Sequence, residues 1–333
     1  MRNVEHKPPF PWFGGKSAVA DKVWAALGDC KNYVEPFFGS GAVLFLRPNG
    51  AGAIETVNDA DGFVANFWRA MRHDVHAVAE HADNPVNEAD LHARHLWLLG
   101  ERERITERLM GDAEFFDAKA AGWWCWGQCC WIGSGWCSGN GPWVSVDGEM
   151  VLRNTGQGVN RKRPHLGDTG QGVNRKLPHL GDSGKGRREF IIHYLGGFAD
   201  RLRNVRVCCG DWSRVCGPSA TFRHGMTGVF LDPPYADTAT RTKDLYATDC
   251  EQVAHRVREW AIEQGKNPLM RIVLAGYEGE HDMPSTWRVE EWEAVGGYGL
   301  IADEDGAGRA NKGRERLWFS PACISPVPER MLF

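Results

Sequence analysis

The chain has 333 residues, of which 42% are hydrophobic and 25% are charged, and its formal net charge is −4. This composition excludes a collagen-like, fibrous or wholly disordered protein, and the length allows two domains or one core with a large insertion. No stretch approaches the roughly 18 uninterrupted apolar residues of a membrane span, and the first residues lack the apolar segment of a signal peptide. We therefore expect a cytoplasmic protein without a membrane partner, in which the ten cysteines are reduced thiols.

The predicted elements before residue 75 alternate between helix and strand, as is typical of an α/β fold. They are a helix over 17–27, a strand at 33–34, a glycine turn at 39–41, a helix over 42–46, a strand over 54–57 that ends in Asn58 and Asp59, and a helix over 62–71. Residues 88–121 also look helical, and they lead into a segment in which six tryptophans fall between positions 123 and 143.

A tandem repeat of 14 residues occupies 155–168 and 169–182, and its glycines and prolines predict turns or a β-hairpin arm. The surrounding segment, 153–188, holds nine basic and two acidic side chains, so its net charge is +7 while the whole chain is acidic. A basic arm on an acidic body is suited to neutralising DNA phosphates, and a solvated loop that touches nothing is the alternative. The candidate DNA-binding residues are Arg161, Lys162, Arg175 and Lys176.

Alternating elements resume after the repeat. They are a helix over 189–202, strands over 205–208 and 229–231, a helix over 251–263, a strand over 271–274, and closing strands with 287–292 and 316–319. The sequence therefore predicts an α/β core interrupted by an insertion of roughly 100 residues.

The strongest local motif is Asp-Pro-Pro-Tyr at 232–235, directly after the apolar strand 229–231. Two prolines fix an extended turn without donors, so the Asp232 carboxylate and the Pro233 carbonyl project beyond the carboxyl end of the strand, where α/β sheets bind ligands. Two such acceptors suit the two N–H groups of an exocyclic nucleobase amine, and Tyr235 offers a ring on which a flipped-out base stacks. A rigid turn without chemistry is the alternative. The candidate catalytic residues are Asp232, Pro233, Pro234 and Tyr235.

A second motif, Glu-Pro-Phe-Phe-Gly-Ser-Gly at 35–41, also follows a strand. Its glycines let the backbone approach a small ligand, and the acid Glu35 suits a cationic amine better than a phosphate. Asp59 ends the next strand, where α/β nucleoside sites hold an acid against ribose hydroxyls. Together they predict a site for a nucleoside without phosphates, although an ordinary tight turn contains the same glycines.

In this order the motifs resemble the DNA adenine-N6 methyltransferase family, in which the cofactor loop precedes the target-recognition region and the catalytic loop follows it. Five segments carry the resemblance: 11–16 (PWFGGK), 34–41, 58–59, 209–212 (CGDW) and 232–235. It covers about 1–75 and 185–320, and between 120 and 187 it is a weaker similarity to phage-type members with Trp-rich and Gly-rich insertions.

The resemblance implies a Rossmann-like class I methyltransferase core over 1–75 and 188–333, with an inserted DNA target-recognition region over 76–187. It implies S-adenosylmethionine as cofactor, double-stranded DNA as partner, and methyl transfer to the N6 amine of adenine. Trp12 and Lys16 would close the cofactor pocket, Asp59 would hold the ribose, and Asp211 would hold the adenine of the cofactor. The implied cofactor-binding residues are Trp12, Gly15, Lys16, Glu35, Phe37, Phe38, Gly39, Gly41, Asp59 and Asp211.

A sulfonium methyl donor is itself a strong electrophile, so the protein needs alignment and desolvation more than a powerful base. We expect Asp232 to accept hydrogen bonds from the amine, with the proton lost as the methyl group arrives. We expect no metal, because the cysteines between 125 and 137 form one uneven cluster instead of paired zinc ligands. The nearby tryptophans predict a packed subdomain, with stacking on bases as the alternative.

Two rival functions follow from the same residues. An N4-cytosine methyltransferase uses the same loop geometry, although an aspartate in the first position is more typical of the adenine enzymes in families that the chain resembles. A DNA-binding protein that has lost catalysis would act by occluding sites, against which the intact Asp232, Tyr235, Asp59 and glycine loop argue.

Overall fold

The computed structural model describes residues 8–12, 15–50, 52–131, 136–137, 143–146, 149–152, 187–234, 245–292 and 313–325. The chain forms two compact units, and each is built from two separate segments. A helical unit contains Met1–Trp12 and Ala60–Arg203, and a sheet unit contains Phe13–Asp59 and Asn204–Phe333.

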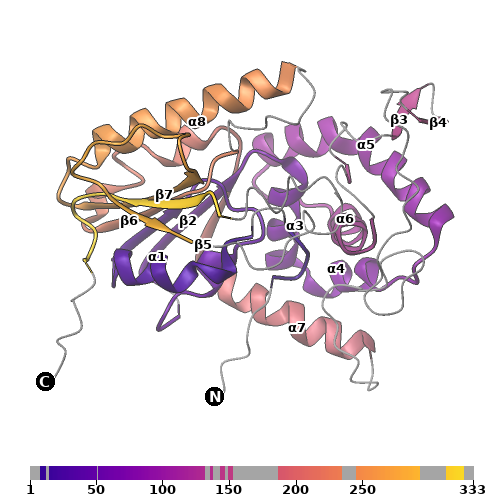
Figure 1. The fold of residues 1–333 in the computed structure, drawn as a ribbon. Coiled ribbons are helices and arrows are strands. Elements are labelled where there is room, and N and C mark those ends of the chain that lie inside the picture. Colours follow the sequence, from indigo (N-terminus) through magenta and orange to yellow (C-terminus); the bar gives the residue numbers. More distant parts are fainter. Residues whose placement is uncertain are drawn as a thin grey trace, which may run out of the picture. The chain divides into compact units, whose positions relative to one another are not determined.

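Seven strands form one sheet in the sheet unit, in the order β5-β2-β1-β6-β7-β9-β8 (Figure 1). The strands are β1 (Asn32–Glu35), β2 (Ile54–Asp59), β5 (Val205–Cys209), β6 (Thr227–Leu231), β7 (Met270–Tyr277), β8 (Arg288–Glu291) and β9 (Glu315–Phe319). The first five in the sheet order are parallel, while β9 runs antiparallel to both β7 and β8. The chain moves outward from β1 to β2 and β5 and then returns to β6, so the strand order reverses between β1 and β6.

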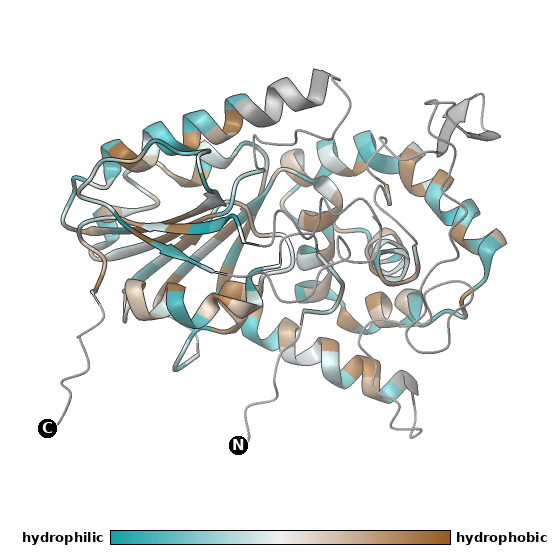
Figure 2. Cartoon of the chain, in the orientation of Figure 1, coloured by the Kyte–Doolittle hydropathy of each residue, from teal (hydrophilic) through white to brown (hydrophobic). Residues whose placement is uncertain are grey.

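Helices α1 (Ala20–Leu27) and α8 (Leu245–Gln264) cover opposite faces of this sheet (Figure 1). Strand β6 is buried along its whole length because its side chains pack on both layers. Val229 belongs to the hydrophobic cluster that includes Val257 of α8. On the other face, a Cβ atom at Gly228 would come within 2.8 Å of the Cys30 sulfur, so the close approach there requires glycine. Figure 2 shows hydrophobic residues along the central strands and alternating polar and apolar bands on α8.

The smaller helices of the sheet unit are α2 (Ala42–Phe45) and the 3-10 helices η1 (Lys16–Ala18), η3 (Trp212–Val215) and η4 (Phe222–His224). Helix α2 begins after Gly41, which has a φ of 70°, a value that glycine adopts at no steric cost.

The helical unit contains α3 (Gly62–His73), α4 (Val75–Ala82), α5 (Glu88–Gly111), α6 (Ala118–Cys130) and α7 (Arg187–Leu202), together with the antiparallel pair β3 (Trp143–Val146) and β4 (Glu149–Leu152). Helix α6 packs against α3, α4 and α5. The predicted packed subdomain is confirmed for Trp124, Trp126 and Trp131, whose side chains are buried. Trp123 remains half-buried, with Lys119 Nζ 4.4 Å from its ring centroid.

Two differences from the sequence-based expectations concern the helices. The predicted helix over 88–121 is two helices, because the chain leaves α5 after Gly111 and the Asp117 side chain then accepts a hydrogen bond from the Ala120 amide to start α6. Helices α3 and α7, which the sequence assigns mainly to the core, fall in the helical unit. The assignment of 76–187 as a target-recognition region stays a prediction. In the part of the chain that the structure describes, no helix combines the length and apolar character needed to cross a bilayer.

Candidate active site

Four of the predicted motifs come together at one edge of the sheet. Each of these motifs lies at the carboxyl end of a parallel strand: the loop 35–41 at β1, the pair 58–59 at β2, the segment 209–211 at β5 and Asp232 after β6. The register pairs Val34 with Val229, so the chain leaves β1 and β6 side by side, at the point where the strand order reverses. In open α/β sheets this point is the usual position of a ligand site.

Two backbone amides of the glycine loop donate hydrogen bonds to the end of β2. The Phe38 amide donates to the Asn58 carbonyl at 2.9 Å, and the Gly39 amide donates to Asp59 Oδ2, also at 2.9 Å. Gly41 closes the turn by donating to the Phe38 carbonyl at 2.8 Å. The loop therefore has a defined shape before any ligand enters it.

Asn58 joins three chain segments at this edge and was not singled out as a functional residue from the sequence. Its Nδ2 donates to the Pro36 carbonyl at 3.1 Å and to the Gly210 carbonyl at 2.9 Å. The Gly210 amide in turn donates to the Asp59 carbonyl at 3.0 Å. The signal in the sequence was the polar pair Asn58-Asp59 at the end of an apolar strand, of which only the aspartate had an assigned role.

Asp211 and Phe37 lie on the β5 side of this edge. Asp211 begins η3 by accepting a hydrogen bond from the Ser213 amide at 3.0 Å, and its side chain remains 46% exposed. The hydrogen bonds from Ser213 hold the pKa of the Asp211 carboxyl below its usual value, so it is an anion at neutral pH. The Phe37 ring is partly exposed and stacks on the buried Trp212 ring, with centroids 6.4 Å apart. A carboxylate beside a supported aromatic ring suits a base that has an amino group.

Asp232 forms an ion pair with Lys16, in which Lys16 Nζ lies 2.8 Å from Asp232 Oδ1. The lysine side chain is only 4% exposed and the aspartate side chain 21% exposed. The Lys16 ammonium also lies 5.7 Å from the centroid of the Trp292 ring, which is buried. The sequence placed Lys16 with the cofactor and Asp232 with the target base, whereas the structure brings the two side chains into contact.

Glu35, which ends β1 and begins the loop 35–41, is buried. Its Oε2 accepts a hydrogen bond of 2.9 Å from the Tyr33 hydroxyl, which lies on the same face of β1. Burial raises the pKa of Glu35 well above its ordinary value and outweighs the opposing hydrogen bond, so a neutral carboxyl group is favoured. Its predicted role toward a cationic amine stays a prediction.

The remaining predicted residues belong to the helical unit, adjoin Lys16 or Asp232 in the chain, or fall outside the described residues. Trp12 belongs to the helical unit, where its ring centroid lies 5.8 Å from that of Phe10. Gly15 is exposed and precedes η1, whereas Pro233 is buried and Pro234 exposed. Tyr235 and the basic residues of the repeat, Arg161, Lys162, Arg175 and Lys176, lie outside the described residues.

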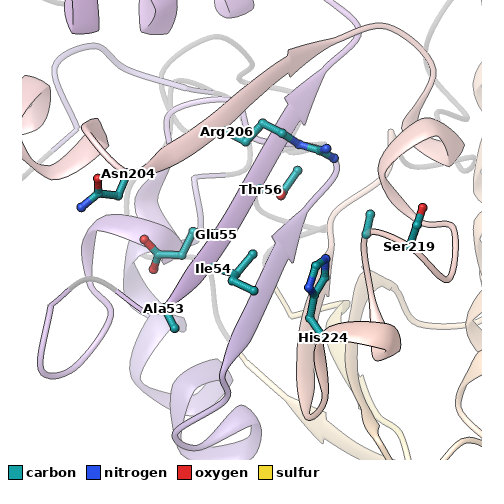
Figure 3. A pocket seen from close by; sticks show the side chains of 9 residues that line it. Ala53, Ile54, Glu55, Thr56, Asn204, Arg206, Ser219 and His224 are labelled. Carbon is teal, nitrogen blue, oxygen red and sulfur yellow. The ribbon is translucent and has the colours of Figure 1, made fainter.

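A pocket elsewhere in the sheet unit lies toward the amino ends of β2 and β5 (Figure 3). Ile54, near the start of β2, and Asn204 and Arg206, around the start of β5, contribute to its lining. It is therefore distant along the strands from the carboxyl-edge motifs and is not part of the candidate site. Within the described ranges, no group of three or more His, Cys, Asp or Glu side chains is arranged to hold a metal ion.

Comparison with known proteins shows which proteins the amino-terminal part of the chain resembles. Residues 12–96 match the model of the D12 class N6 adenine-specific DNA methyltransferase family, which confirms the resemblance for this part of the chain. The matched residues include the glycine loop and the pair 58–59, and they end before Asp211 and Asp232. A curated relative is the DNA N-6-adenine-methyltransferase of Escherichia phage P1, 33% identical over 70 residues, which are 21% of this chain. The alignment spans 9% of the length of the phage protein.

Proposed function

We propose that this protein is a DNA methyltransferase that transfers a methyl group from S-adenosylmethionine to the exocyclic N6 amine of a flipped-out adenine in duplex DNA. The observation that carries the proposal is the placement of the glycine loop and Asp232 after neighbouring strands, β1 and β6, where the strand order reverses. The family match over residues 12–96 supports the same reaction.

The strand order also supports a Rossmann-like class I methyltransferase core. Five parallel strands wind outward in both directions from β1 and β6, as in doubly wound sheets that bind nucleosides at their carboxyl edge. Helices on both faces bury the central strands β6 and β7, which fits the largely apolar sequences of these two strands.

The residues at this edge fit S-adenosylmethionine. Asp59, at the end of β2, would bind the ribose hydroxyls, and the partly exposed Phe37 and Asp211 would hold the adenine ring and its amino group. The loop 35–41 would lie against the amino-acid part, held in shape by its bonds to Asn58 and Asp59. When bound, the cofactor supplies an electrophilic methyl group on a sulfonium.

Asp232 and the Pro233 carbonyl would accept the two hydrogens of the target amine. Accepting both hydrogens directs the nitrogen lone pair away from the adenine ring and toward the methyl group. Tyr235 would stack on the extruded base. The protein thus contributes alignment of donor and acceptor, and the carboxylate stabilises the positive charge that develops on the amine.

The charge distribution supports DNA as the partner through the basic arm. Residues 60–131 of the helical unit carry seven Lys or Arg and twelve Asp or Glu side chains, so this stretch is acidic overall. The arm at 153–188 has the opposite charge and suits contacts with phosphates. We propose that it belongs to a target-recognition region over 76–187.

The test is the identity of the product. Purified protein is incubated with labelled S-adenosylmethionine and plasmid DNA that lacks methylated bases, and the digested nucleosides are separated by mass spectrometry. We expect the modified nucleoside to be N6-methyl-deoxyadenosine. N4-methylated deoxycytidine instead would favour the cytosine enzyme. Cofactor binding without any product on mixed-sequence DNA would favour the DNA-binding protein that has lost catalysis.

A further inference from the structure

The ion pair with Lys16 involves one of the two oxygens of the Asp232 carboxylate. Oδ1 lies 2.8 Å from a lysine that is almost fully buried, while the aspartate itself is 21% exposed. For Oδ2 the described part of the chain provides no hydrogen-bond donor. One oxygen is thus held by the protein, and the partial exposure of the side chain allows the other to meet a ligand.

Lys16 has little freedom to leave this position. A buried ammonium costs several kcal/mol unless it is paired, so separation from Asp232 is unfavourable without a replacement anion. The backbone of Lys16 begins η1, where its carbonyl accepts a hydrogen bond of 3.1 Å from the Val19 amide. The Trp292 ring, 5.7 Å away, adds a cation–π contact on the same ammonium.

We propose that Lys16 is a positioning residue that aims Asp232 Oδ2 at the target amine, and that it does not bind the cofactor. The inference rests on the proposed function, because it concerns how Asp232 receives the adenine. Lys16 acts through the carboxylate, so its effect falls on the methyl-transfer step and leaves the affinity for S-adenosylmethionine unchanged.

The pair also has a consequence for the proton. As the bond from the amine nitrogen to the methyl carbon forms and the methyl–sulfur bond breaks, the sulfonium becomes a neutral thioether and the amine becomes cationic. One amine proton then passes to the Asp232 carboxylate. Lys16 is already an ammonium and cannot accept it. The proton therefore leaves from Asp232 to water, which can reach this side chain because it is 21% exposed.

The experiment separates binding from transfer in the full chain. Lys16→Met keeps the length of the side chain and removes its charge, and Lys16→Arg keeps the charge and changes its geometry. The matched control is Lys22→Met, on the neighbouring helix α1, where the lysine is half-exposed and pairs with Glu290 at 3.6 Å. Calorimetry gives the Kd for S-adenosylmethionine, and single-turnover transfer at saturating cofactor and DNA gives the rate.

We expect Lys16→Met to lower the single-turnover rate by about 100-fold, the loss associated with a small misplacement of a reacting group. Its cofactor Kd should stay within about threefold of the wild-type value. Lys16→Arg should recover part of the rate, and Lys22→Met should match the wild type in both measurements.

Three results for Lys16→Met would overturn the inference. The first is a raised Kd for the cofactor with an unchanged rate at saturation, and the second is no change in either the rate or the Kd. The third is a lower rate together with a raised Kd in a variant whose thermal unfolding matches the wild type. If Lys16→Met does not fold, the same two measurements are made on Lys16→Arg. We then expect a lower single-turnover rate and an unchanged Kd for the cofactor. A wild-type protein that gives no methylated product would instead overturn the proposed function itself.

Discussion

The Gly39 amide donates a hydrogen bond of 2.9 Å to Asp59 Oδ2, so the acid at the end of β2 holds the glycine loop that follows β1. Asp59 therefore has two connected tasks in the proposed site: it would bind the ribose, and it keeps the loop in place. Substitutions of Asp59 that keep or remove the acceptor for the Gly39 amide can separate ribose binding from support of the loop.

Asp59→Ala removes both the charge and the acceptor for the Gly39 amide. Loss of a charged hydrogen-bonding group costs about 1.5–3 kcal/mol, so we expect cofactor affinity to fall by roughly 10- to 100-fold. Asp59→Asn retains an oxygen acceptor for the loop, and its loss should be smaller. Calorimetric titration with S-adenosylmethionine measures both. The nucleoside site would be wrong if Asp59→Ala weakened only DNA binding.

Asp232→Ala tests the catalytic assignment. The acceptor for the target amine is removed, whereas the glycine loop is tied to β2 and not to Asp232, so transfer should be abolished while cofactor binding stays within about tenfold. The control is Glu263→Gln at the far end of α8, an exposed acid paired with Lys266. A variant that kept a tenth or more of the wild-type turnover would contradict the assignment.

His281 predicts a loss of stability in acid. It is buried beside Trp318, and burial lowers its pKa to about 4. In the unfolded chain a histidine titrates near 6.5, so this contribution to stability is complete above that pH. As the pH falls from about 6.5 toward 4, the unfolded chain binds a proton that the folded chain does not, and stability is lost.

We therefore expect His281→Phe to reduce the drop in thermal unfolding temperature between pH 7 and pH 5. His193→Gln, at an exposed position on α7, should retain the wild-type drop. An equal drop in the wild type and His281→Phe would mean that His281 does not contribute to acid sensitivity.

Phe10 anchors the amino-terminal segment within the helical unit. Its side chain is 1% exposed, and its ring lies 4.8 Å from Trp124 and 5.3 Å from Phe67, between centroids. Phe10→Ala should destabilise the protein by about 3–5 kcal/mol, measured by urea unfolding. Met110→Ala, at a position 57% exposed, should change stability by less than about 0.5 kcal/mol. Similar effects of the two substitutions would show that Phe10 does not anchor the segment.

The repeat arm predicts a strong dependence of DNA binding on salt. Removing one phosphate-binding side chain should lower the slope of log affinity against log salt concentration by about 0.9. Replacing Arg161, Lys162, Arg175 and Lys176 with alanine should flatten the slope by up to about 3 to 4 units, leaving the preferred sequence and the cofactor affinity unchanged. An unaltered slope would identify the arm as a solvated loop.

The sequence predicted the central strands β6 and β7 well because each contains a short apolar run between polar or glycine-rich turns and is buried on both faces. It also placed the loop 35–41, Asp59 and Asp232 at strand ends, because residues that follow parallel strands gather at one edge. Helix α4 was not predicted, since eight residues give too little periodicity to recognise.

Side-chain pairing was beyond the reach of the sequence. Lys16 and Asp232 belong to motifs far apart in the chain, and no spacing rule indicates that their charges meet. The double hydrogen bond of Asn58 and the approach of Trp292 to Lys16 likewise depend on three-dimensional packing. Periodicity identifies the faces of elements, whereas contacts between loops follow from how the completed sheet brings those loops together.

The pairing of β1 with β6 has a consequence for the order of folding. Asn32 Nδ2 donates to Thr227 Oγ1 at 3.1 Å, a hydrogen bond between residues 195 positions apart in the chain. Closing so long a loop is entropically unfavourable until other interactions have shortened it, whereas β1 and β2 are close in sequence and pair at lower cost. We therefore expect the edge that carries the glycine loop to form early, and Asp232 to join it only after β6 has been synthesised. During translation the growing chain would have a partial nucleoside site well before it has a complete one.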